Sequence, residues 1–149
     1  MLVTASEWQP HICAWLSTKG VGAFSHVDTQ VIAWASGEPL ELTSAIAFSN
    51  ATSRHCFASI YVQEKKLPRA LLRAGLLYAF SQLKLARLTF IIEEANLASI
   101  RFVTNLGAIP EATLRGAGNS GDLRIFALFP ENCKLWRIFD GQRFRAEST

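Results

Sequence analysis

The feature that most constrains the fold is one amphipathic helix between two apolar strands. The segment RALLRAGLLYAFSQL (residues 69–83) carries apolar residues at the i, i+3/i+4 spacing of a helix with one buried face. HCFASIYV (55–62) precedes it and ARLTFII (86–92) follows it, the latter apolar enough for a strand covered on both faces. Two strands joined through a helix form a parallel crossover, so the sequence predicts a β-α-β unit.

The residues before this unit predict a helix and an antiparallel meander. Ser6 is placed to cap a short helix over 6–16, whose apolar residues fall at helical spacing. TQVIAWAS (29–36) and residues 40–49 read as strands, separated by a Gly-Glu-Pro turn. Together with 55–62 they predict three antiparallel strands that lead into the parallel unit.

The residues after the unit predict a short helix and a hairpin. Asn96 stands before a helical pattern that Gly107 closes. Residues 109–115 and 123–129 read as two strands around the glycine-rich turn GAGNSGD. The predicted fold class is therefore α/β, with a mixed sheet in a single domain over residues 1–149.

Composition narrows the classes of function. No apolar run approaches the roughly 20 residues of a membrane span. The net charge of +3 is too small to indicate nucleic-acid binding by itself. The three cysteines lie far apart and form no Cys-x-x-Cys pair, which predicts a reducing compartment, the cytoplasm, and no metal site. Cys56, within an apolar strand, is expected to be buried rather than to act as a nucleophile.

A cluster of positive charge precedes the long helix. Lys65, Lys66 and Arg69 surround Pro68, a residue suited to the first helical position. A helix N-terminus beyond the carboxyl end of a parallel strand is a natural anion site. The alternative is that these residues are only a solvated helix start.

The segment NLASIRFVTNLGA, from Asn96 to Ala108, carries a family resemblance. With the preceding elements in this order, the chain resembles the GNAT superfamily of acyl-CoA-dependent N-acyltransferases. EATLRGAGNSGDLRIFAL, which follows, is similar to the ribosomal-protein N-terminal acetyltransferase branch. The Pro-Arg step before the long helix and the Cys133 to Trp136 spacing look like small GNAT-like proteins of phages and prophages. The resemblance covers about residues 28–136.

The resemblance implies that the chain binds acetyl-CoA. The family's pyrophosphate loop aligns with the residues before the long helix, where Lys66 and Pro68 stand in place of two glycines. The pantetheine arm would run along the end of the preceding strand and against Asn96, which can equally be a plain N-cap. The cofactor-binding residues expected on this basis are Ile60, Val62, Gln63, Lys65, Lys66, Leu67, Arg69, Asn96, Ser99 and Phe102.

The catalytic groups are less marked. Many GNAT enzymes have a tyrosine acid where this chain has Val103, so Ser99 is the substitute candidate. Glu93 and Glu94, just past the parallel strand, are candidate bases, as is His55, and Tyr61 is a further proton donor. For each of these residues a surface or packing role is the alternative.

We therefore expect an acetyl-CoA-dependent N-acyltransferase that acts on an amine of a small molecule or of a protein, such as a host protein. The alternative is a catalytically degenerate GNAT-fold phage protein that acts by binding a protein partner. Membrane and nucleic-acid partners are not expected, and pairing of two chains through their C-terminal strands is left open. If the protein is phage-encoded, its compartment is the host cytoplasm.

Overall fold

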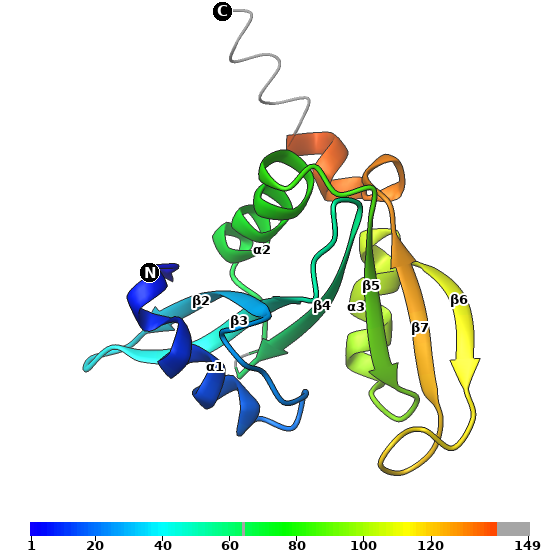
Figure 1. Cartoon of the computed structure of the whole chain (residues 1–149), viewed down its shortest axis with the longest axis horizontal. Helices are drawn as coiled ribbons and strands as arrows, with labels where there is room; N and C mark the ends of the chain where they lie inside the picture. Colours follow the sequence, from blue (N-terminus) through cyan, green and yellow to red (C-terminus); the bar gives the residue numbers. More distant parts are fainter. Residues whose placement is uncertain (64, 140–149) are drawn as a thin grey trace, which may run out of the picture.

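The chain folds around one seven-stranded mixed sheet. The computed structural model describes residues 1–63 and 65–139. The strand order is β1-β2-β3-β4-β5-β7-β6, in which β4 and β5 are parallel and all other neighbours antiparallel (Figure 1). The strands are β1 (Leu2–Val3), β2 (Thr29–Ser36), β3 (Glu41–Ser49), β4 (His55–Val62), β5 (Arg87–Glu93), β6 (Ile109–Leu114) and β7 (Leu123–Leu128).

Helices cover the two faces of the sheet unequally. α1 (Gln9–Ser17) lies on one face, against β2 and β3. α2 (Arg69–Leu76), α3 (Leu97–Leu106) and the helical residues 134–139 lie on the other (Figure 1). Short 3₁₀ turns stand at Ser6–Trp8 and Pro130–Asn132. No helix of the described residues is long and apolar enough to cross a membrane.

Two apolar cores result, one on each face of the sheet. On β3, Ile46 and Phe48 belong to the large core under α2 and α3, whereas Ala45 and Ala47 belong to the smaller core under α1. Side chains alternate between the faces of a strand, so β3 is buried on both sides. The small alanines leave room for α1 to lie close to the sheet.

The predicted meander, parallel crossover and C-terminal hairpin are confirmed. Gly75 lets the long helix lie close to β3, because a Cβ there would lie 2.9 Å from Cδ1 of Ile46. The helix predicted over residues 69–83 is α-helical only as far as Leu76 and continues as a π-helical segment, Leu77–Gln82. Its apolar residues remain in the core, so the spacing alone did not reveal the wider turn.

The N-terminal helix differs from expectation in its start. Ser6 caps nothing with its side chain, because Ala5 precedes the 3₁₀ turn and the α-helix begins only at Gln9. The buried Gln9 amide instead bonds the main chain of Val31, with the Oε1 acceptor 2.8 Å from its N and the Nε2 donor 2.9 Å from its O. This pair ties α1 to β2. The two-residue strand β1 was not predicted.

Candidate functional site

The two central strands separate along their length. β4 pairs with β5 only from His55 to Phe57, opposite residues 87–89; we call this the closed end. Beyond it, residues 58–62 of β4 and 90–93 of β5 form the open end, where no strand of the described residues pairs with the facing edges (Figure 1). Unpaired backbone groups at such edges need other partners. The open end can therefore receive an extended ligand by main-chain hydrogen bonds.

The basic residues predicted as an anion site follow the open end of β4. Pro68 was expected at the first helical position but stands at the N-cap of α2, which begins at Arg69, and it makes no side-chain cap. The first N–H groups of α2 thus have no side-chain acceptor there, which suits an anion. Of the predicted ligands, Leu67 packs against the large core. The others are exposed: Gln63, Lys65, Lys66 and Arg69.

A further contact at this site was not visible in the sequence. The guanidinium of Arg69 lies 5.6 Å from the ring centroid of Phe139, and that of Arg73 lies 5.7 Å from it. Phe139 itself is buried against the large core. The helical residues 134–139 therefore place an aromatic ring beside the cations of α2. Residues 140–149 lie outside the described residues.

α3 begins on the opposite side of the open end. The side-chain oxygen of Asn96 accepts a hydrogen bond of 3.2 Å from the N–H of Ser99, so the predicted N-cap is confirmed. Asn96 is exposed and Ser99 half-buried, and Phe102 packs on the large core. Val103 is almost fully buried. The position where many GNAT enzymes carry a tyrosine is thus a core position in this chain.

The two candidate bases lie where β5 meets the β6–β7 turn. Oε1 of Glu93 accepts a bond of 2.7 Å from the N–H of Asn119, and its carboxylate lies directly against Gly118. Oε2 of Glu93 is buried without a hydrogen-bond partner among the described residues. The Glu94 carboxylate lies against Gly121, and its main-chain N–H bonds Asp122. The turn therefore holds the Glu93 carboxylate at the open end, and the exposed Glu94 carboxylate lies beside the same turn.

Tyr61 points to the face that α1 covers. Its ring meets that of Trp15 edge to face, with centroids 5.6 Å apart. The Lys19 ammonium lies over both rings, 5.3 Å from the centroid of Trp15 and 5.8 Å from that of Tyr61. Tyr61 is half-buried, so the structure gives it a packing contact and leaves it beside the open end.

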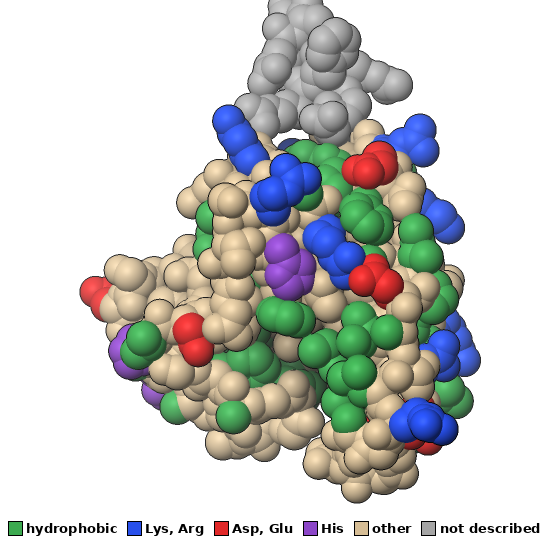
Figure 2. Space-filling model, turned by 45° about the vertical axis from the view of Figure 1, so that its right-hand side comes forward, with side chains coloured by type: hydrophobic (Ala, Val, Ile, Leu, Met, Phe, Trp, Pro, Cys, Tyr) green, Lys and Arg blue, Asp and Glu red, His purple; other side chains and the backbone are tan. Residues whose placement is uncertain are grey.

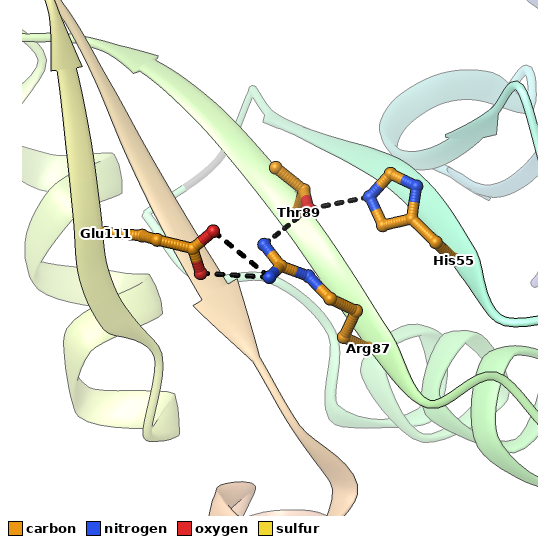
Figure 3. A network of polar contacts seen from close by, with 4 residues as sticks. All are labelled: His55, Arg87, Thr89 and Glu111. Carbon is orange, nitrogen blue, oxygen red and sulfur yellow. Dashed lines mark hydrogen bonds and ion pairs between the residues drawn. The ribbon is translucent and has the colours of Figure 1, made fainter.

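The closed end carries a polar network that the sequence did not suggest (Figure 3). Arg87 donates two bonds, of 2.9 and 3.1 Å, to the Glu111 carboxylate and one of 3.0 Å to the Thr89 hydroxyl. The Thr89 hydroxyl lies 2.6 Å from Nε2 of His55. Burial, and then the charge of Arg87, lower the pKa of His55, which Glu111 partly offsets. His55 is thus held at the end of the pair remote from Glu93.

The cysteines take no part in this site. All three are free and buried. Burial raises the pKa of the Cys56 thiol to about 11, so at neutral pH it is a thiol and a poor nucleophile. Burial also raises the pKa of Cys13 and of Cys133. Among the described residues, no three His, Cys, Asp or Glu side chains are grouped so as to hold a metal ion.

No protein-family model matches the sequence, and no curated protein matches it. Solved structures do match its fold. A mutant of spermidine N-acetyltransferase SpeG from Vibrio cholerae aligns over 87% of this chain and 94% of its own, with a TM-score of 0.68 and 12% identity. The same enzyme in complex with CoA and spermine aligns over 89% and 96%, with a TM-score of 0.68 and 13% identity. A probable acetyltransferase aligns over 87% and 92%, with a TM-score of 0.59 and 13% identity.

The chain therefore has the fold of the GNAT superfamily. At this level of identity the likeness shows the fold alone. The resemblance to phage proteins and to the ribosomal-protein branch stays a prediction. The matched structures give no support to the alternative of a binding protein without turnover.

Proposed function

We propose that the protein transfers an acetyl group from acetyl-CoA to an amine. The observation that carries this proposal is the open end of the β4–β5 pair, which has unpaired strand edges between a basic helix start and the Asn96-capped start of α3. The matched complex with CoA and spermine supports an acyl-CoA donor and an amine acceptor for this fold.

The residues at the open end fit an acyl-CoA. Lys65, Lys66 and Arg69 would neutralise the pyrophosphate in front of the uncapped N–H groups of α2. The main chain of Ile60 and Val62 would bond the pantetheine arm. On the other side, α3 offers three side chains that would enclose this arm, together with Gln63 and Leu67 at the helix start: Asn96, Ser99 and Phe102.

In this reaction the donor supplies an activated thioester. The amine nitrogen forms a bond to the thioester carbonyl carbon, the carbon–sulfur bond breaks, and the thiolate takes up one proton while the amine loses one. Glu93 or Glu94 would accept the amine proton, directly or through water. Ser99 or Tyr61 would give a proton to the departing thiolate.

The proposal also covers the acceptor amine and the cellular compartment. The acceptor is an amine of a small molecule or of a host protein, in the cytoplasm. The three buried free cysteines support a reducing compartment. The exposed edge strand β6 leaves room for the homodimer considered from the sequence.

Calorimetric titration of the full chain with acetyl-CoA tests the proposal. We expect binding at micromolar concentrations, and a loss of about tenfold for Lys66→Glu, because the substitution reverses one charge at the phosphate site. Lys84→Glu is the matched control, since Lys84 is exposed just past the far end of the same helical segment and its substitution should leave affinity unchanged. Absence of binding at millimolar acetyl-CoA would overturn the proposal. Equal losses in both variants would mean that Lys66 is not at the phosphate site.

A further inference from the structure

A cavity of about 640 Å³ lies on the α1 face of the sheet. It is open to solvent on one side and is bordered by β1, α1 and the ends of β2 and β3 that lie nearest to the open end of β4. Its size is within the range of small-molecule sites. None of the residues assigned above to acetyl-CoA, apart from Gln63, lines it.

The walls of this cavity are mostly aromatic and aliphatic. Trp8 and His11 meet edge to face, with ring centroids 6.1 Å apart, and Trp15 extends the same wall along α1. Leu40 and Leu42 also line the cavity. Two of these large apolar side chains remain exposed, Trp8 by 52% and Leu40 by 58%. Exposed apolar groups around a concave site are typical of a surface that a ligand covers.

The cavity borders the end of β4. Gln63, which directly follows β4, forms part of its wall. Tyr61, two residues earlier, packs against the cavity residue Trp15. The basic start of α2 lies on the opposite face of the sheet. An acyl group that reaches between the separated strands from the α2 side would therefore emerge on the face of the sheet that carries this cavity.

The charges of the cavity select among amines. The Lys19 ammonium lies over the rings of Trp15 and Tyr61 and lines the cavity. Among the described residues of the wall, Glu41 is the only carboxylate. A ligand with several ammonium groups could pair only one of them with Glu41, and the positive charge of Lys19 would repel the others. An amine with an apolar body would instead bury that body against the rings.

We propose that this cavity is the acceptor subsite and that it takes a primary amine carried on a flat aromatic body. The proposal rests on the acyl transfer proposed above. The ring would lie against Trp8 and Trp15, and the amine nitrogen would point past Tyr61 towards the open end. The uncharged amine attacks the thioester carbon, the carbon–sulfur bond breaks, and the proton that the nitrogen loses balances the one that the thiolate gains.

The test compares two amines on the full chain. Binding of 2-phenylethylamine and of spermidine is measured by calorimetry in the presence of CoA. We expect 2-phenylethylamine to bind at least about tenfold more tightly, and Trp8→Ala to weaken it by about tenfold through the loss of one aromatic wall. Ile138→Ala is the control, because Ile138 is similarly exposed, at 49%, but lies outside the cavity. Lys19→Gln should strengthen spermidine binding severalfold, since it removes the like charge.

Equal or tighter binding of spermidine by the wild-type chain, or an unchanged affinity of Trp8→Ala for 2-phenylethylamine, would overturn the proposal. Trp8 is largely exposed, so its truncation should leave the chain folded, and an unchanged unfolding temperature checks this. Acetyl-CoA binding, titrated separately, should be equal in all these variants. If 2-phenylethylamine binds as expected but acetyl-CoA does not, the proposed acyl transfer is wrong and the cavity is not an acceptor subsite. The preference of the cavity for aromatic amines would still be supported.

Discussion

The closed end and the open end of the β4–β5 pair belong to the same two strands but use their polar groups in opposite ways. At the closed end, His55, Thr89, Arg87 and Glu111 are bonded to one another across three strands (Figure 3). At the open end, strand edges and the basic start of α2 have no such partners among the described residues. Groups that are already paired contribute to stability, whereas groups left unpaired are available to a ligand.

The surface around the closed end extends this contrast. Hydrophobic side chains gather on the sheet face that α2 and α3 do not cover, beside charged residues of the network (Figure 2). Phe57, Ile91, Ile109 and Leu114 share this face by their strand register, and each is exposed by between 37% and 45%. The cation of Arg87 also lies 5.6 Å from the ring centroid of Phe129. The closed end is thus bound into its surroundings by several kinds of contact.

The largest expected effect comes from breaking the closed end. Thr89 is only 5% exposed, and Thr89→Val removes the hydroxyl that both His55 and Arg87 contact. We expect a loss of about 1–3 kcal/mol in the free energy of unfolding, because the half-buried ring nitrogen of His55 and the charged guanidinium of Arg87 both lose a partner. Urea unfolding measures this. Thr113→Val, at an exposed position of β6, is the matched control. Acetyl-CoA affinity should stay unchanged, and a large loss of affinity would mean that the two ends are not independent.

A smaller effect separates two roles of Asn96 at the open end. Asn96→Ala should cost about 1 kcal/mol of stability, because α3 loses its N-cap. Asn96→Asp keeps a capping oxygen but loses the amide donor, so stability should be kept while acetyl-CoA affinity falls severalfold. Thermal unfolding and calorimetry on the same samples measure both quantities. If Asn96→Asp binds acetyl-CoA with unchanged affinity, Asn96 acts only as the N-cap of α3 and not as a ligand of the cofactor.

The smallest effect is a dependence of stability on pH that originates at the closed end. Burial and the charge of Arg87 lower the pKa of His55, against the opposing charge of Glu111. The folded chain therefore binds fewer protons at His55 than the unfolded chain, in which the pKa of a histidine is about 6.5. Stability should fall as the pH drops below that value towards the lowered pKa. Urea unfolding measured as a function of pH checks this, and in His55→Gln the fall in stability below this pH should be absent. If the variant and the wild-type chain have the same pH dependence, His55 is not its source.

The sequence carried the parts of this structure that depend on local spacing. The apolar period of residues 69–83 predicted the crossover helix, and the helical pattern after Asn96 predicted that Asn96 caps α3. The order of elements, through the family resemblance, predicted a cofactor site between the end of β4 and Asn96. These predictions depend either on residues within a few positions of one another or on the order of the elements along the whole chain.

The parts that the sequence did not reveal depend on contacts between distant segments. Arg87 and Glu111 meet across the sheet, and their separation of 24 residues leaves no local signal. Lys19 reaches Tyr61 only because α1 lies on β2 and β3. The π-helical turn after α2 keeps the same residues buried as a regular helix would. Only the paired strands bring these groups together.

Hydrogen–deuterium exchange with and without saturating acetyl-CoA tests the central claim most directly. If the ligand bonds the open strand edges, exchange should slow at the amides of residues 58–62 and 90–93, and should stay unchanged at 55–57 and 87–89. Binding without any slowing at 58–62 would contradict the account, because the ligand would then lie somewhere other than between the separated strands.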